Sequence, residues 1–400
     1  MDELSVDISS GVAELDPGEW NRIAAGGGPF VRHEFLTALE ETGCVGPNTG
    51  WIPQILVARD RADDRLVGAA PLYIKTHSAG EFVFDWGWAE AAQRAGIQYY
   101  PKGVVAIPFT PVTGGRLLVG EGAERAESIR RMLVDEALAF AERSNLSSIH
   151  FNFLQPEDRR VLEERGLPVR ESFQYHWYNG RRDADRGPYE DFDDFLGEFR
   201  SKKRSNIRRE RRKLREAGVE PEILEGEAVT PAHLRRMYRY YRRTVEKYFG
   251  GSLYLNEEFF LTLGREMGDR LQMVVLEREG EEFAGAFNML GDDRLFGRYW
   301  GATEEIDFAH FEACFYSSIE WCIDRGVDVF EGGSGGDHKV DRGFEPTRTY
   351  SAHHVRHPAL VEAIEDFIDR ESRKIDRQLE EMREDSPFKS DGDGGPSGEG

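Results

Sequence analysis

The chain has 400 residues and a net charge of -22 at pH 7, from 74 acidic and 52 basic side chains. This length exceeds what one core usually organises, so we expect two domains of moderate size. The acidic surface disfavours general nucleic-acid binding, DNA included, because it would repel a polyanion. An anionic ligand must therefore dock at a local site.

The three cysteines, Cys44, Cys314 and Cys322, are too few and too irregularly spaced for a disulfide framework or a metal site. They indicate structural thiols in a reducing compartment. The N-terminus lacks a basic segment followed by an apolar one, and no stretch approaches eighteen apolar residues. The sequence therefore predicts a cytoplasmic protein without a membrane span.

The chain contains two similar series of predicted elements. Residues 54–74 read as two strands around a charged turn, and residues 271–290 repeat that layout. Each hairpin is followed by a predicted aromatic strand, at 81–89 and at 294–302, and then by an amphipathic helix and a closing strand. This order predicts an α/β fold with mixed, mostly antiparallel sheets, and it indicates an internal duplication.

The domain boundaries follow from the polar segments between these series. An N-terminal domain is predicted over 1–180 and a C-terminal domain over 189–357, the latter with a basic helix at 202–217. A long charged helix with a thin apolar stripe is predicted at 358–384. The Gly-, Ser- and acid-rich end at 385–400 is predicted to be disordered.

A glycine-rich segment follows the last short apolar run of the second series. Residues 331–354 read EGGSGGDHKVDRGFEPTRTYSAHH. GGSGG matches the nucleophile elbow G-x-S-x-G, but an elbow continues into a helix, and Gly343 and Pro346 interrupt any helical period. The P-loop pattern also fails, because Gly336 is not followed by Lys and a hydroxyl residue. A ligand site at the end of a strand and a mobile loop with solvated charges both remain open.

As a ligand site, this loop would combine anion binding with proton transfer. Lys339 and Arg342 can hold a phosphate or carboxylate. His338 or Glu331 can accept a proton from an attacking amine near neutral pH. The glycines let the backbone approach a ligand closely.

A second anion site is predicted on the basic helix, where nine Lys or Arg fall within fourteen residues. Lys203, Arg204, Arg208 and Arg211 are spaced to share one face. The alternative is a solvated helix paired with nearby carboxylates. RNA binding along this helix is a further alternative, although no aromatic residues are interleaved for base stacking.

Histidines other than His338 are further candidates for a binding or metal site. His310 and Glu312 begin the helix of the second series, where such residues often serve only as caps. His353, His354 and His357 have no acidic or thiol partner at a supporting interval, so we predict no metal site.

From about residue 11 to 381 the chain resembles the FemAB-like predicted N-acyltransferases of the GNAT superfamily. The resemblance is carried, in order, by RSNIRRERRKLREAGV, TVEKYFGGSLYLNEEFF, GAFNMLGDDRLFGRYWG, HFEACFY and EGGSGGDHKVDRGFEPTRTYSAH. It implies two tandem GNAT-like domains and an EC 2.3 activity, the transfer of an acyl or aminoacyl group to an amine.

The resemblance leaves the donor open. GNAT enzymes that use acyl-CoA usually carry a [QR]-x-x-G-x-[GA] pyrophosphate loop at a helix N-terminus. Arg298 to Thr303 matches that pattern only in part. Acyl-CoA and aminoacyl-tRNA therefore both stay as donors, and no tightly bound cofactor is expected.

The leading hypothesis is an N-acyltransferase that acts on a small-molecule amine, with His338 or Glu331 as the base. The predicted substrate-binding residues are Lys203, Arg204, Arg208, Arg298, His310, Glu312, Lys339 and Arg342. The alternative is a non-catalytic protein that holds an anionic partner on the basic helix. The sequence leaves the oligomeric state open.

Overall fold

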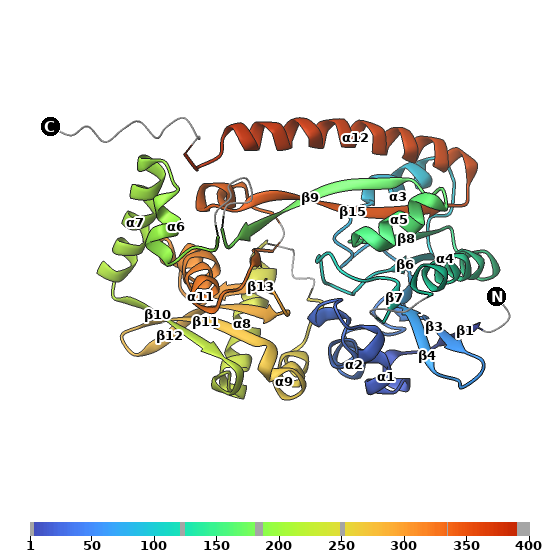
Figure 1. The fold of residues 1–400 in the computed structure, drawn as a ribbon, viewed down its shortest axis with the longest axis horizontal. Helices are drawn as coiled ribbons and strands as arrows, with labels where there is room; N and C mark the ends of the chain where they lie inside the picture. Colours follow the sequence, from blue (N-terminus) through green and yellow to red (C-terminus); the bar gives the residue numbers. More distant parts are fainter. Residues whose placement is uncertain (1–3, 121–124, 181–186, 249–252, 334, 390–400) are drawn as a thin grey trace. The chain divides into compact units, whose positions relative to one another are not determined.

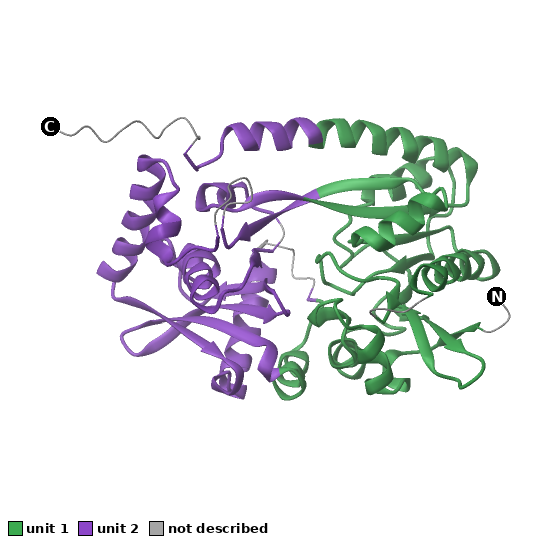
Figure 2. Ribbon diagram, viewed as in Figure 1, with its two compact units in different colours: residues 1–172, 254–267, 348–375 green, residues 173–253, 268–347, 376–400 purple. Residues whose placement is uncertain are grey.

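The computed structural model describes residues 4–120, 125–180, 187–248, 253–333 and 335–389 (Figure 1). The chain divides into two compact units (Figure 2). Unit 1 comprises residues 1–172, 254–267 and 348–375, and unit 2 comprises residues 173–253, 268–347 and 376–400. The predicted domains, 1–180 and 189–357, follow the chain without interruption, whereas the two units exchange segments.

Three elements pass from one unit into the other along the chain. They are β9 (Val169–Tyr178), β15 (Glu345–Val355) and α12 (Pro358–Glu384). Helix α12 is the predicted C-terminal helix. Of the predicted disordered end, residues from Ser390 onward lie outside the described part, while Phe388 packs against Phe199 in unit 2 with ring centroids 4.9 Å apart.

Unit 1 is an α/β unit with two groups of strands. Its elements besides the shared ones are β1 (Leu4–Ser9), α1 (Pro17–Ile23), α2 (His33–Glu41), β2 (Trp51–Pro53), β3 (Ile55–Asp60), β4 (Leu66–Ala70), β5 (Leu72–Lys75), α3 (Trp86–Arg94), β6 (Lys102–Val105), β7 (Leu118–Val119), α4 (Ala126–Arg143), β8 (Ser148–Asn152), α5 (Pro156–Glu164) and α9 (Glu257–Glu266). One group has the antiparallel order β1-β3-β4-β7, and the other has the order β15-β8-β6-β5-β2 with β6 and β8 parallel. Pro71, which cannot donate to a ladder, separates β4 from β5 at the point where the chain changes group.

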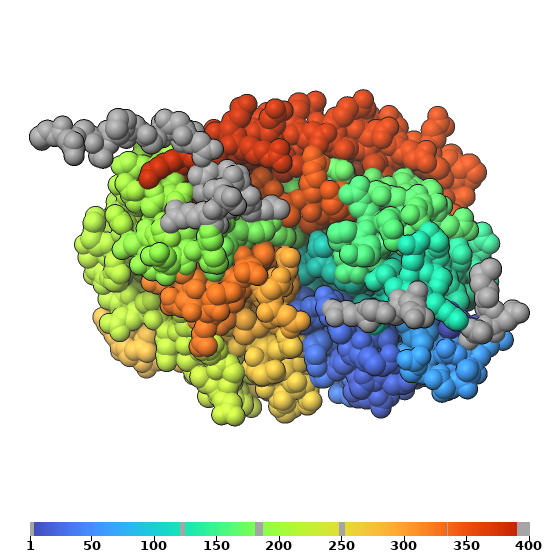
Figure 3. Space-filling model, viewed as in Figure 1, coloured from blue at the N-terminus to red at the C-terminus, as the bar shows by residue number. Residues whose placement is uncertain are grey.

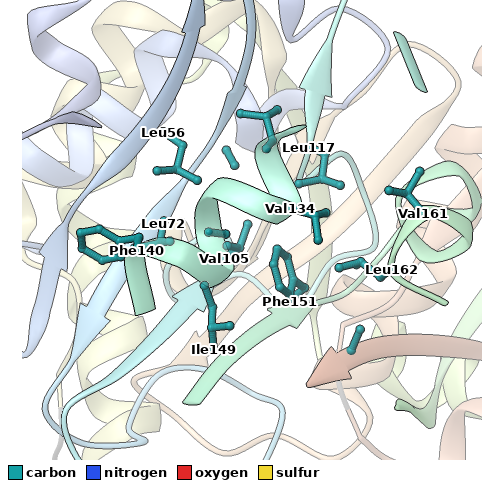
Figure 4. Close-up of a cluster of buried hydrophobic side chains, with 14 of the residues drawn as sticks. Leu56, Leu72, Val105, Leu117, Val134, Phe140, Ile149, Phe151, Val161 and Leu162 are labelled. Carbon is teal, nitrogen blue, oxygen red and sulfur yellow. The ribbon is translucent and has the colours of Figure 1, made fainter. Parts of the chain in front are cut away.

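The core of unit 1 lies between its strands and α4 with α5 (Figure 4). Helix α4 buries Ile129, Leu133, Val134, Ala137 and Phe140, which recur at intervals of three or four residues. They pack with strand residues such as Leu56, Val105 and Phe151. This apolar stripe is the signal from which the sequence predicts the helix.

The predicted aromatic strand at 81–89 is wrong, because residues 81–85 bend and α3 begins at Trp86. Lys102 donates from Nζ to Glu81 Oε2 at 2.9 Å and also to Asp85. In a strand, residues 81 and 85 would lie about 13 Å apart, too far for both carboxylates to reach one ammonium. The chain therefore folds back over Lys102, and β7 takes the place beside β4.

Unit 2 follows the same order of hairpin, strand, helix and strand as unit 1. Its elements are α6 (Phe192–Gly197), α7 (Ser201–Glu216), β10 (Val219–Glu225), α8 (Pro231–Tyr248), β11 (Leu271–Arg278), β12 (Glu281–Leu290), β13 (Arg294–Ala302), α10 (Ala309–Phe311), a π-helical turn (Glu312–Tyr316), α11 (Ser317–Arg325), β14 (Val329–Glu331) and a 3-10 helix (Asp337–Arg342). The strand order is β10-β11-β12-β13-β14-β9-β15. The antiparallel run β10 to β13 matches β1-β3-β4-β7 of unit 1, as an internal duplication predicts.

The basic helix α7 packs on unit 2 through a narrow stripe. Ile207, Glu210 and Leu214 are its buried residues, while most of its basic residues are exposed. Its outer face belongs to the surface seen in yellow-green in Figure 3. Among the described residues, none of the helices combines the length and hydropathy needed to cross a membrane.

Candidate functional site

The candidate site lies in unit 2, where strands β13 and β14 part. The two strands are parallel neighbours only where Arg294–Phe296 faces Val329–Glu331. Beyond that point β13 continues to Ala302, while the chain after Glu331 enters the glycine-rich loop. α/β proteins commonly bind ligands at such carboxyl ends of strands.

The glycine-rich loop has a backbone conformation that favours glycine. Gly333 and Gly336 have φ angles of +78° and +93°, and a Cβ on Gly336 would lie 2.6 Å from the His338 ring. Ser334, the serine of the elbow pattern, lies outside the described residues. Residues 337–342 form a 3-10 helix, ended by Gly343 at φ +85°, where the sequence analysis expected no helical period.

Lys339 holds this loop from the inside. Its Nζ donates to the carbonyl oxygen of Gly333 at 2.8 Å and to that of Gly335, and the residue is only 4% exposed. Burial lowers the pKa of Lys339 to about 8. Its ammonium is therefore engaged with the protein backbone.

His338 lies in an aromatic group with His310. The two imidazole centroids are 5.7 Å apart, and Phe311 and Phe315 contact both rings. Burial, followed by the charge of Arg342, lowers the pKa of His338, and burial lowers the pKa of His310 to about 3. Both rings are therefore neutral at pH 7, and a pKa of about 3 makes His310 a weak base, which leaves His338 as the proton acceptor of this group.

The glycine-rich loop and the basic helix meet in unit 2. Arg342 Nη2 donates to Glu210 Oε2 of α7 at 3.0 Å, and Lys203 of α7 donates to Asp341. Arg342 also donates to the carbonyl oxygen of His338 at 2.8 Å. Lys203 and Arg342 are thus paired with carboxylates of the protein.

Glu312 is buried in the π-helical turn, a feature that is frequent at functional sites. Arg211 Nη2 of α7 donates to Glu312 Oε1 at 2.8 Å. Arg208, in contrast, pairs with the exposed Asp193 at 2.8 Å, and Arg204 is half-buried on the same helix. The predicted basic residues therefore divide between the site and the outer surface.

Glu331 belongs to a different group from His338. Phe330 packs into the aromatic core that contains Phe315, so the next strand residue, Glu331, faces the other side of the sheet. Arg294 Nη1 donates to Glu331 Oε1 at 3.3 Å. Burial raises the pKa of Glu331 to about 7, although Arg294 and Arg298 act against this rise. The two predicted bases thus lie in separate surroundings.

The partial pyrophosphate motif at Arg298 to Thr303 is mostly strand. Arg298 to Ala302 belong to β13 and not to a loop at a helix N-terminus. A Cβ on Gly301 would lie 2.1 Å from the carbonyl oxygen of Tyr240, so this glycine lets α8 approach the strand. Its presence is explained by packing.

A pocket of about 850 Å³ opens beside this part of the site. Its lining residues are Arg236, Arg239, Tyr240, Arg242, Arg243, Thr244, Glu246, Lys247, Glu282, Trp300, Ala302, Thr303, Glu304, Glu305, Ile306, Ala309 and His310. Within the described ranges, Arg239 and Arg243 form no ion pair, whereas Arg236 pairs with Glu282 at 2.5 Å. The pocket thus offers two guanidinium groups to an anion and reaches His310.

The arginines of α8 were not predicted as site residues from the sequence. Arg236, Arg239, Arg243 and Lys247 recur at intervals of three or four residues and so share a helix face, a signal as readable as that of α7. Arg294 and His176, which lie beside Glu331, were also not predicted, because neither of them belongs to a motif. No group of three or more potential metal ligands occurs in the part of the chain that the structure describes.

Comparisons with known proteins agree with this architecture. A FemAB-like family model, described as peptidoglycan biosynthesis/recognition, matches residues 11–390. No curated protein matches the chain. The crystal structure of FemX is 12% identical with a TM-score of 0.52, over 88% of this chain and 98% of that chain. The structure of L-PGS from Bacillus licheniformis is 13% identical with a TM-score of 0.50, over 88% and 95%.

These likenesses show the fold. The predicted fold class, α/β with two units, mixed and mostly antiparallel sheets and a C-terminal helix, is confirmed.

Proposed function

This chain belongs to the FemAB-like family, and on that premise we propose that it is an N-acyltransferase. It moves an acyl or aminoacyl group from an activated donor to an amine acceptor. The observation that carries the proposal is the pocket of unit 2, in which Arg239 and Arg243 lie on one helix and His310 lines the wall. His310 contacts His338, so a proton acceptor, His338, lies one residue away from the anion-binding surface.

The pocket is proposed to hold the phosphate-bearing part of the donor. Guanidinium groups bind phosphate oxygens through paired hydrogen bonds. A volume of about 850 Å³ lies within the range of small-molecule sites. Acyl-CoA and aminoacyl-tRNA both carry phosphate groups in addition to the reactive thioester or ester, and both remain donor candidates.

The reaction requires one proton acceptor. The amine nitrogen attacks the donor carbonyl carbon, a C–N bond forms, and the C–S or C–O bond to the leaving group breaks. The amine loses a proton to the base, and the leaving thiol or alcohol takes one up. Glu331, with a pKa of about 7, suits this role at neutral pH, and neutral His338 is the second candidate.

The test is a donor panel of acyl-CoAs and aminoacyl-tRNAs with amine acceptors, measured by release of CoA or deacylated tRNA. With the active donor, Arg239→Ala/Arg243→Ala should raise KM at least tenfold. Arg94→Ala, which removes an exposed arginine of α3 in unit 1, should leave KM unchanged. The proposal is contradicted if none of the donors releases CoA or deacylated tRNA. It is also contradicted if KM is unchanged in the double variant.

A second candidate function is supported by α7. Lys202, Arg209, Arg212, Lys213 and Arg215 are all exposed on this helix in an otherwise acidic chain. A non-catalytic protein could use this face to hold an anionic partner, tRNA included. Binding of tRNA that is lost in Arg209→Ala/Arg212→Ala, without turnover of any donor, favours this function.

A further inference from the structure

One face of the unit 2 sheet carries a polar group beside the point where β13 and β14 part. His176 of β9 is the register partner of Glu331, and Val329 is opposite both Tyr178 and Arg294. Register partners share a face, and so do residues two apart in a strand. His176, Tyr178, Arg294 and Glu331 therefore lie on one face, opposite the aromatic core that buries Phe330.

Glu331 has one carboxylate oxygen without a hydrogen bond. Oε1 accepts from Arg294, but Oε2 is buried and has no hydrogen-bond partner among the described residues. His176 Nε2 lies 3.6 Å from Oε2, too far for a hydrogen bond. A buried carboxylate oxygen left unpaired costs free energy, which an N–H donor from a ligand would recover.

Arg294 brings a charge of the opposite sign to the same place. Its side chain is 39% exposed, while that of Glu331 is 6% exposed. A guanidinium has five N–H donors, and Arg294 uses one of them on Glu331 at 3.3 Å, while Asp293 lies 3.5 Å from its Nε. The exposed N–H groups of this guanidinium can therefore bind a carboxylate through two parallel hydrogen bonds. Arg298, further along β13, adds positive charge that acts on Glu331.

We propose that this face is the acceptor subsite and that the acceptor is a zwitterionic amine, an amino acid or peptide with a carboxylate near its reactive nitrogen. Glu331 Oε2 accepts a hydrogen bond from the amine, and Arg294 binds the carboxylate of the same molecule. The inference rests on the proposed acyl transfer and specifies its acceptor. Arg294 is then the residue that selects the acceptor.

The charges of the subsite follow the reaction. The acceptor enters as an ammonium, and Glu331 as a carboxylate takes its proton. The neutral amine then attacks the donor carbonyl carbon, a C–N bond replaces the C–S or C–O bond, and the departing thiolate or alkoxide takes up the proton that the new amide nitrogen loses. The proton on Glu331 passes to solvent before the next cycle.

The test compares L-lysine with cadaverine, the same diamine without the carboxylate, by NMR titration of the purified full chain. Wild type should bind L-lysine at least tenfold more tightly than cadaverine. Arg294→Ala should remove that difference. Arg270→Ala, a partly exposed arginine whose ion pair with Asp292 is also 3.3 Å long, is the matched control and should retain it.

Equal affinities for the two amines, no binding of either, or an unchanged preference in Arg294→Ala overturns the subsite. The variant Glu331→Gln should lower the affinities for L-lysine and cadaverine by about the same factor, because both molecules carry the amine. This equal loss distinguishes the amine contact from the carboxylate contact, which only L-lysine can make. Because the titration needs no donor, it is independent of turnover. Carboxylate-dependent binding without turnover refutes the transferase, and turnover of cadaverine as good as that of L-lysine refutes the subsite alone.

Discussion

The ammonium of Lys339 donates to the carbonyl oxygen of Gly333 at 2.8 Å, so a buried cation holds the glycine-rich loop. The positive charge of Lys339, predicted from the sequence to bind a ligand, therefore contacts backbone carbonyl oxygens of the protein. This contact changes what a substitution of Lys339 should do.

Lys339→Met should destabilise the protein by about 1–3 kcal/mol, because two backbone carbonyls lose a charged donor. Hydrogen exchange followed by mass spectrometry should show faster exchange at Gly333 and Gly335, whose carbonyl oxygens accept from Lys339. Lys213→Met, at an exposed position on α7, is the control and should change neither measurement. Unchanged exchange in the loop would contradict the structural role of Lys339.

Arg342→Ala should destabilise the protein by about 3–5 kcal/mol, since it leaves the buried carboxylate of Glu210 without its cation. The double variant Glu210→Gln/Arg342→Met removes both charges and should recover a large part of that loss. Urea unfolding of both variants measures the difference. A double variant no more stable than Arg342→Ala would show that the ion pair is not what joins α7 to the 3-10 helix.

Gly301→Ala should destabilise unit 2 by about 1–3 kcal/mol, because the added methyl group would lie 2.1 Å from the carbonyl oxygen of Tyr240 and α8 would have to move. Gly268→Ala is the control, since its Cβ would meet nothing within 4 Å. Thermal unfolding of the two variants compares them directly. The shift of α8 should also weaken binding in the pocket that it lines.

The pH dependence of kcat/KM distinguishes the two candidate bases. Burial raises the pKa of Glu331 to about 7, so a rate that depends on its carboxylate should rise with pH and level off above pH 7. The pKa of His338 is lowered from 6.5, so a rate that depends on its neutral ring levels off at lower pH. Glu331→Gln should abolish the limb near pH 7 and lower kcat by about 10²–10⁴-fold. A limb that survives in Glu331→Gln but not in His338→Gln assigns the base to His338.

The sequence predicted most of the fold because the elements carry strong periodic signals. The stripe of α4 and the paired hairpins are readable from residue spacing alone. The segment 81–89 was misread because its aromatic residues favour a strand, whereas the ion pairs of Glu81 and Asp85 with Lys102 depend on a residue far along the chain. Long-range charge pairing has no local pattern.

The candidate site was predicted in composition but not in arrangement. The sequence marked α7 and the loop as charged segments, but the ion pairs that join them, Arg342 with Glu210 and Lys203 with Asp341, have no local pattern. The separation of Glu331 from His338 depends on which side of the sheet each faces, and Phe330 fixes that side by packing in the core. The pocket arginines of α8 were passed over because an amphipathic helix with a basic face is usually just a solvated helix.

The exchange of segments between the units has a consequence for how the protein is made. Strand β8 cannot gain its neighbour β15 until residues 351–355 have been synthesised, and α9 joins unit 1 only after residue 257. Unit 1 is therefore completed only after residues 351–355 have left the ribosome. A truncated protein ending at residue 172 should emerge as an incomplete fragment prone to degradation, even though it holds nearly all the strands of that unit.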